Sequence, residues 1–192
     1  MPPDDRNLLF SPQAKNLLLT GPPGVGKSTV IQKTLSLLSS PAEGFLTAEI
    51  REGKRRLGFR LTTLSGEKTI LAHRDLRDGP RVGPYGVDVE SLERVGVSAL
   101  RRALSGEFSL IVIDEIGKME MKSAAFREVV FQCLESPRRV LGVIGKGVVE
   151  GEKIRGRADV LCLEVTSQNR DGLPKALSAW AGFQPREAGG EH

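Results

Sequence analysis

The chain has 192 residues, which suits a single domain that is large enough to bury a hydrophobic core. Its hydrophobic content of 39% and charged content of 27% are ordinary for a soluble globular protein, and no apolar run reaches the roughly 20 residues that a membrane-spanning helix needs. The net charge is +4, but lysine and arginine are spread along the chain and aromatic residues make up only 5% of it. Nucleic-acid binding is therefore open but unsupported, because no stacking surface for bases is visible.

The first half of the chain predicts a strand, a helix and an antiparallel region. Residues 1–15 predict a flexible extension without the features of a secretion signal, so we expect a cytoplasmic protein. The apolar run 16–20 predicts a buried strand, and 27–38 has the apolar spacing of a helix. Alternating patterns between 44 and 74 predict two or three strands that are at least partly antiparallel. The stretch 75–88, rich in Gly, Pro and Arg, predicts an exposed loop.

The second half alternates helices and buried strands. Helices are expected over 89–104, 123–136 with Ser123 as N-cap, and 169–182, and strands over 108–117, 138–145 and 159–165. This alternation predicts an α/β fold with a mostly parallel sheet, helices on both faces and an antiparallel addition, in one domain over 16–183. Residues 184–192 lack a core pattern and predict a disordered tail. Cys133 and Cys162 lie in apolar surroundings, which predicts two buried, unreactive thiols.

The stretch "GPPGVGKS" matches the phosphate-loop pattern G-x-x-x-x-G-K-[ST] in full, with Gly21, Gly26, Lys27 and Ser28 at the defining positions. Glycines allow backbone N–H groups to curl around phosphate oxygens, and the N-terminus of the next helix adds its dipole. Lys27 would contact the β- and γ-phosphates, and the Ser28 hydroxyl would ligate Mg²⁺. An apolar strand precedes the loop and a helix follows it, so this stretch predicts a polyphosphate site.

Two acidic residues end the apolar run "LIVIDEIG". Asp114 occupies the position at which phosphate-loop proteins carry an aspartate that holds Mg²⁺. Glu115 follows directly, and its carboxylate could orient or deprotonate a water molecule. Alone, the pair could equally begin a loop or cap a helix. "DEIG" also fits the D-x-x-G of GTPase switches, but "SQNRDG" lacks the N-K-x-D pattern that would read guanine. Together with the phosphate loop, the pair favours a hydrolytic site.

The motifs "LTGPPGVGKST", "RVGPYGVD", "VIDEIGKME" and "NRD" occur in an order that resembles the THEP1-type nucleoside-triphosphatases over nearly all of residues 16–180. The resemblance implies a RecA-like P-loop fold with an added strand, and slow Mg²⁺-dependent hydrolysis of ATP, GTP and other nucleoside triphosphates. By position it implies two nucleotide-binding segments: Gly21, Pro22, Pro23, Gly24, Val25, Gly26, Lys27, Ser28 and Thr29, and Leu110, Ile111, Val112, Ile113, Asp114, Glu115, Ile116 and Gly117.

Several basic residues are weaker candidates. Arg155, in "KIRGR", could stabilise charge on the γ-phosphate, although such runs are more often solvated surface. Arg170 could flank the base, and Lys118 could orient the acidic pair or the phosphate. Arg81 and Tyr85 could belong to a loop on the substrate side, but a packed aromatic residue is an equal alternative.

The leading hypothesis is a nucleoside-triphosphate phosphohydrolase. Lys27, together with Mg²⁺ held by Ser28 and Asp114, would bind the phosphates, and Glu115 would position the attacking water. No motif for reading a particular base is visible, so we expect broad base specificity, and we expect a monomer. The alternatives are a small-molecule kinase, for which no acceptor motif is visible, and a non-catalytic module that binds partners in response to nucleotide.

Overall fold

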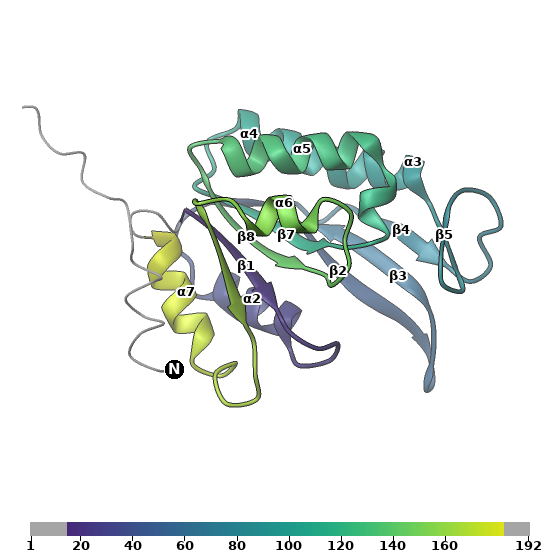
Figure 1. Cartoon of the computed structure of the whole chain (residues 1–192), viewed down its shortest axis with the longest axis horizontal. Helices are drawn as coiled ribbons and strands as arrows, with labels where there is room; N and C mark the ends of the chain where they lie inside the picture. The colour runs from purple at the N-terminus through teal and green to yellow at the C-terminus, as the bar shows by residue number, and fades with distance from the viewer. Residues whose placement is uncertain (1–14, 183–192) are drawn as a thin grey trace, which may run out of the picture.

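A computed structural model describes residues 15–182, in which one mixed sheet of nine strands runs through the molecule in the order β5-β6-β4-β3-β2-β7-β8-β1-β9 (Figure 1). The strands are β1 (Asn16–Thr20), β2 (Ala42–Glu52), β3 (Arg55–Thr63), β4 (Lys68–His73), β5 (Arg81–Val82), β6 (Tyr85–Val87), β7 (Leu110–Ile116), β8 (Arg139–Ile144) and β9 (Val160–Glu164). Five of them, β2, β7, β8, β1 and β9, pair in parallel. Their carboxyl ends therefore meet at one edge of the sheet.

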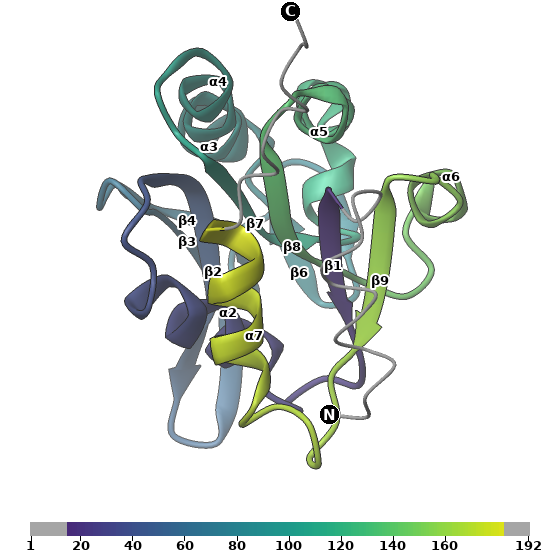
Figure 2. The same cartoon turned by 90° about the vertical axis from the view of Figure 1, so that its left-hand side faces the viewer.

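Helices cover both faces of the sheet, as Figures 1 and 2 show, with α2 and α7 on one face and α4 and α5 on the other. The helical elements are α2 (Lys27–Ser36), α3 (Val89–Ser91), π-helix η1 (Leu92–Val97), α4 (Ser98–Ser105), 3₁₀-helix η2 (Glu120–Lys122), α5 (Ala124–Glu135), α6 (Gly151–Arg155) and α7 (Leu173–Gly182). Side chains alternate along β1, so Leu18 packs into the core under α5 while Leu17 and Leu19 pack into the core under α2 and α7. The α/β fold with helices on both faces, as predicted, is confirmed.

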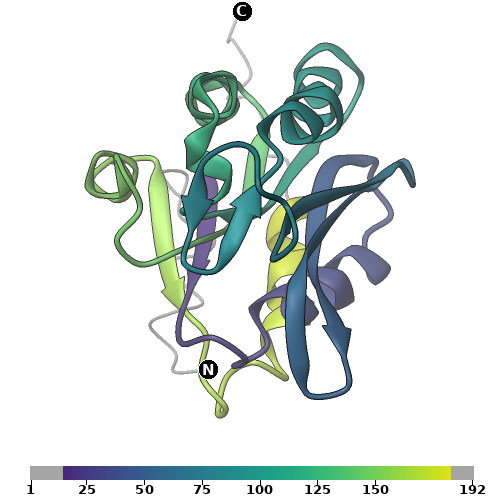
Figure 3. The same ribbon diagram turned by 90° about the vertical axis from the view of Figure 1, so that its right-hand side faces the viewer.

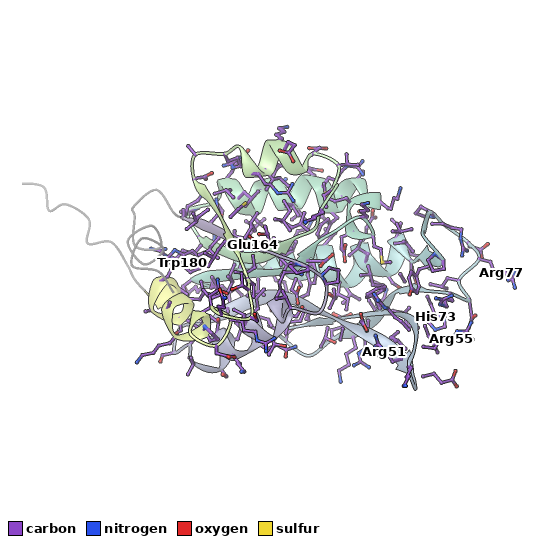
Figure 4. All side chains as sticks on the ribbon, turned by 60° about the horizontal axis from the view of Figure 1, so that its bottom comes forward. Arg51, Arg55, His73, Arg77, Glu164 and Trp180 are labelled. Carbon is purple, nitrogen blue, oxygen red and sulfur yellow. The ribbon has the colours of Figure 1, made fainter. Side chains whose placement is uncertain are left out.

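The antiparallel addition consists of β3, β4, β5 and β6, which extend the sheet beyond β2. This is more than the single added strand that the family resemblance implies, while the three strands over 42–73 agree with the sequence patterns. Figure 4 places Arg51, Arg55, His73 and Arg77 at this end of the molecule and Trp180 at the other. Arg51 in β2 and Arg55 in β3 thus flank the turn between these two strands.

The prediction of an exposed loop over 75–88 is wrong for its second half, which carries β5 and β6. Tyr85 and Val87 are buried, and the Tyr85 ring packs edge-on against Phe59 with the Arg74 guanidinium over it. Arg81 donates hydrogen bonds to the carbonyl oxygens of Leu76 and Pro84 and so holds the turn in place. The contacts on Tyr85 come from Phe59 on β3 and from Arg74, which directly follows β4, and they favour the packed-aromatic alternative for Tyr85.

The prediction that both cysteines are buried holds for Cys133 in α5 but is wrong for Cys162, which is exposed. Cys162 lies on β9, an edge strand that pairs with β1 alone, so its side chain lacks cover despite its apolar sequence neighbours. Both thiols are free within the described part of the chain. The extension predicted over 1–15 and the tail predicted over 184–192 lie outside the described residues, Lys15 excepted.

Candidate nucleotide site at the carboxyl edge of the sheet

The loop between β1 and α2 is shaped by glycines with positive φ at positions 21, 24 and 26. Gly21 has φ +132°, and a Cβ there would lie 2.8 Å from the carbonyl oxygen of Val165, so only glycine fits without displacement. Gly26 precedes α2 with φ +111° and provides no side-chain cap, so no side chain satisfies the first N–H groups of this helix. Such a helix N-terminus attracts anions through free N–H groups and the helix dipole.

The Lys27 ammonium group folds back over this loop. Its Nζ donates hydrogen bonds to the carbonyl oxygens of Gly21 at 2.9 Å and Pro22 at 3.0 Å. The charge therefore lies over the loop that the sequence assigns to phosphate, and the carbonyl partners could be exchanged for anionic oxygens.

Asp114 lies near the end of β7 and is 1% exposed. In the sheet, β8 alone separates β7 from β1, so the segments that follow β7 and β1 flank the end of β8. Burial raises the pKa of Asp114 to about 7, and the adjacent Ser28 side chain partly opposes this rise. One carboxylate oxygen, Oδ2, is buried without a hydrogen-bond partner. The Ser28 hydroxyl and the Asp114 carboxylate thus lie close together, and the Oδ2 atom of Asp114 there has no hydrogen-bond donor.

Glu115 continues the same strand, and the peptide bond that precedes it is cis. Burial raises the pKa of its carboxyl group, while the charge of Lys27 opposes the rise. Glu115 therefore lies within the electrostatic reach of the loop lysine although 88 positions separate the two in sequence. The structure brings both halves of the predicted site together at one sheet edge.

Glu120 is a component that the sequence reasoning did not single out. It is 3% exposed, and its pKa is raised to about 8, first by burial and then by the charge of Glu115. Both carboxylates border Gly117: a Cβ there would lie 2.5 Å from Glu115 Oε1 and 2.6 Å from Glu120 Oε2. An acidic residue between two methionines in "KMEMK" was the signal available in the sequence.

Four other residues assigned to the second nucleotide-binding segment, those over 110–113, lie inside the sheet. Ile111 and Ile113 pack into the core under α5, while Leu110 and Val112 pack into the core under α2 and α7. All four are at most 1% exposed. Their side chains hold β7, which carries Asp114 and Glu115, in the core, and they do not line the phosphate loop over 21–26.

A cavity of about 300 Å³ borders the phosphate loop at Gly24 and Gly26. It is lined by Gly24, Gly26, Thr29, Val30, Lys33, Arg170 and Asp171. Arg170 follows β9 and donates a hydrogen bond to the Val25 carbonyl oxygen at 3.3 Å. Its neighbour Asn169 fixes this turn by accepting from the Thr166 N–H and donating to the Glu164 carbonyl oxygen. Arg170 is thus brought to the loop from a distant part of the chain.

The structure separates the basic residues of the "KIRGR" segment. Arg157 pairs with Asp159 near the amino end of β9, and Lys153 lies over the Phe131 ring, so neither is at the loop. Arg155 donates a hydrogen bond of 2.6 Å to the carbonyl oxygen of Gly145, in the segment that follows β8. A Cβ on Gly145 would lie 3.7 Å from Glu115 Oε1, so the segment that Arg155 holds borders the acidic pair.

Within residues 15–182, no group of three or more histidine, cysteine, aspartate or glutamate side chains is arranged to hold a metal ion. Magnesium in phosphate sites commonly takes only one or two protein ligands and completes its shell with phosphate and water. The pairing of Ser28 with a partly unpartnered Asp114 fits that smaller donor set. In the same residues, no helix has the length and apolar character needed to cross a membrane.

Fold and site together define an α/β protein with a glycine-rich, anion-attracting loop and buried acidic residues at the carboxyl edge of its parallel strands. The chain belongs to the NTPase family, whose sequence model matches residues 16–178. It is 48% identical over 158 residues to the nucleoside-triphosphatase THEP1 of Thermotoga maritima, an alignment that covers 82% of this chain and 90% of that protein.

Solved structures agree with this assignment. The crystal structure of THEP1 from Aquifex aeolicus superposes with a TM-score of 0.76 at 32% identity, covering 88% of this chain and 99% of that one. The solution structure of a human cancer-related nucleoside triphosphatase superposes with a TM-score of 0.73 at 41% identity, covering 88% of this chain and 98% of that one. Sequence and structure therefore point to the same family, as the motifs predicted.

Proposed function

We propose that this chain is a Mg²⁺-dependent nucleoside-triphosphate phosphohydrolase that converts ATP, GTP and other nucleoside triphosphates to diphosphates and phosphate. The names of its relatives support the activity. The observation that carries the proposal is the position of the Ser28 side chain beside the Asp114 carboxylate, whose pKa it lowers, because this joins the glycine-rich loop to the acidic end of β7. A polyphosphate on the loop would thereby lie beside the acidic residues.

The proposed architecture is a RecA-like P-loop fold in one domain over 16–183. Two features support it: a strand–loop–helix unit at 16–36, and the inner position of β1, with β9 on one side and β8, β7 and β2 on the other. A single sheet that includes every described strand supports one domain rather than two.

In this proposal the phosphates are bound by the loop over 21–26, the first N–H groups of α2 and the Lys27 ammonium group. Lys27 would exchange its two carbonyl partners for phosphate oxygens, which offer a charge-assisted hydrogen bond in place of a neutral acceptor. The absence of a side-chain cap on α2 supports the same role, since a cap would compete for these N–H groups.

Mg²⁺ would be held by Ser28 and Asp114, directly or through water. The buried Oδ2 of Asp114, which has no hydrogen-bond partner, supports this assignment, since a hard cation prefers such oxygen ligands. When bound, Mg²⁺ supplies charge neutralisation at the phosphate oxygens.

Glu115 would orient the attacking water and accept its proton as the water oxygen bonds to the γ-phosphorus and the β–γ anhydride bond breaks. Burial makes this carboxylate more basic than an exposed one, while Lys27 favours its ionised form. Arg155 would stabilise charge that develops on the γ-phosphate. Its hydrogen bond to Gly145, in the segment that borders Glu115, supports this role.

The nucleoside would occupy the cavity beside the loop, where Arg170 could stack on or flank the base. Lys33, Arg170 and Asp171 are exposed side chains that can adopt several positions, which supports broad rather than narrow base specificity. We also propose a cytoplasmic monomer. Free thiols suit a reducing compartment, and every component of the site comes from one chain.

The decisive experiment measures phosphate release from ATP with Mg²⁺ and no acceptor, using the wild type, Glu115→Gln and the control Glu107→Gln, an exposed site before β7. We expect the Glu115 variant to keep its nucleotide affinity and lose turnover by on the order of 100-fold, while the control matches the wild type. Unchanged turnover in the Glu115 variant would remove its proposed role. Absence of phosphate release, with phosphorylation of an added nucleoside instead, would favour the kinase alternative.

A further inference from the structure

A second cavity, of about 250 Å³, lies among three loops, and none of its lining residues belongs to the phosphate loop or to the cavity beside Arg170. It is lined by Arg81, Val82, Lys118, Met121, Lys122, Gly147 and Val149. These residues come from β5, from the segment that follows β7 and from the turn that follows β8. The turn that carries β5 and β6 faces the viewer in Figure 3.

The lining of this cavity carries three cationic side chains and no carboxylate. Arg81 is fixed by the carbonyl oxygens of Leu76 and Pro84. Across residues 15–182, the side chains of Lys118 and Lys122 form no hydrogen bond or ion pair. The acidic residue closest in sequence to both lysines, Glu120, is buried and directed toward Gly117 and Glu115. Three cations around one small volume repel each other, and a dianion would relieve that repulsion.

The rest of the lining is apolar. Val82 and Met121 form part of the wall, and Val149 is 67% exposed although large hydrophobic side chains are usually covered. A methionine adapts its shape to ligands more readily than a branched side chain does. A ligand that only carried charge would leave these groups uncovered, so an apolar body attached to the anion suits the cavity better.

The cavity is also held in shape without a ligand. Gly147 has φ +62°, where a larger residue would strain the backbone, and it lies against the Lys118 side chain, because a Cβ there would be in contact with Cε at 3.4 Å. The backbone at Gly147 and the hydrogen-bonded Arg81 thus shape two of the three segments that line the cavity. A volume of about 250 Å³ lies below the usual range for sites of drug-sized ligands, which limits the occupant to a small molecule.

We propose that this cavity binds a small organic phosphate monoester, with its dianion between Lys118, Lys122 and Arg81 and its apolar body against Val82, Met121 and Val149. The proposal does not depend on nucleoside-triphosphate hydrolysis. It does place a second ligand next to the hydrolytic site, because Lys118 follows Glu115 by three residues and Gly147 follows Gly145 by two.

The test uses phenyl phosphate as a probe and follows the amide and methyl resonances of the full chain by NMR, with the nucleotide site saturated by ADP and Mg²⁺. We expect saturable shifts at the Met121 and Val149 methyls and the Gly147 amide. Lys122→Glu should weaken binding by about tenfold or more, because it removes one cation and adds an anion. The matched control is Lys68→Glu at the start of β4, where Lys68 pairs with Thr62 of β3 and does not line the cavity. This variant should bind phenyl phosphate as the wild type does.

Four results would overturn the proposal. Inorganic phosphate could bind as tightly as phenyl phosphate, or Val149→Ala could leave the affinity for phenyl phosphate unchanged. In either case the apolar half of the site would be wrong. Shifts confined to residues 21–27 would mean that the probe binds only at the phosphate loop. Binding by a 5′-phosphorylated oligonucleotide or a phosphopeptide, but not by phenyl phosphate, would assign the site to a macromolecule instead.

Discussion

Replacing Glu120 by glutamine should stabilise the nucleotide-free protein, and increasingly so as the pH rises. The pKa of this buried carboxyl group is about 8, compared with an ordinary value of 4.5. Each pKa unit corresponds to about 1.4 kcal/mol, so ionising Glu120 costs roughly 5 kcal/mol more in the folded protein than in the unfolded chain. Below pH 4.5 both states are protonated and nothing is lost. Between pH 4.5 and 8 the unfolded state releases its proton first, so the stability of the wild type falls.

Glutamine has the same shape and keeps an acceptor oxygen beside the backbone of Gly117 and of its own residue, which favour such an acceptor. The variant should therefore match the wild type near pH 4.5 and exceed it by roughly 4.5 kcal/mol at pH 8.5. Urea unfolding at four pH values across this range measures the difference. Glu128→Gln, at an exposed position on α5, serves as the control and should show no such trend. A gain that does not depend on pH, or a variant less stable than the wild type at pH 8.5, would refute the reasoning.

Two further substitutions test other parts of the structure. Lys27→Ala should weaken binding of Mg²⁺–ATP by roughly 10- to 100-fold in calorimetry, the amount expected for a lost charge-assisted hydrogen bond, whereas the exposed Lys175→Ala should have no effect. Wild-type affinity in the Lys27 variant would contradict the phosphate-loop assignment. Ser123→Ala should lower the free energy of unfolding by about 2 kcal/mol, because it removes the N-cap hydrogen bond to the Phe126 N–H and the hydrogen bond to Glu93. A loss below about 0.5 kcal/mol would show that water replaces both.

The parts of the fold that sequence could predict are those whose cause is local. The strand–loop–helix unit over 16–36 follows from an apolar run, a glycine pattern and helical spacing that are contiguous in the chain. Ser123 was likewise predictable as an N-cap, because its hydrogen-bond partner Phe126 is three residues away. The order of the strands was not predictable in this way, since it depends on pairings such as that of β1 with β8, whose partners are more than 100 residues apart.

The two wrong predictions share a non-local cause. Residues 75–88 have the composition of an exposed loop, yet Tyr85 is buried because Phe59 on β3 and Arg74 after β4 contact it. Cys162 has apolar neighbours in the sequence, yet it is exposed because β9 ends the sheet. Local composition indicates whether a side chain is suited to burial. Whether it is buried depends on the strands and helices that the fold packs against it.

The candidate site shows the same division within a single motif. Asp114 and Glu115 were identifiable because they end an apolar run, and this position in a strand is itself a local property. Glu120 was not identifiable in this way, because it lies five residues after Glu115, beyond the apolar run, and a carboxylate outside such a run normally lies on the surface. Only the fold of the segment after β7 turns it inward to share the border of Gly117 with Glu115. The charge of Glu115 then raises the pKa of Glu120, and no pattern of residue types in the sequence indicates this coupling.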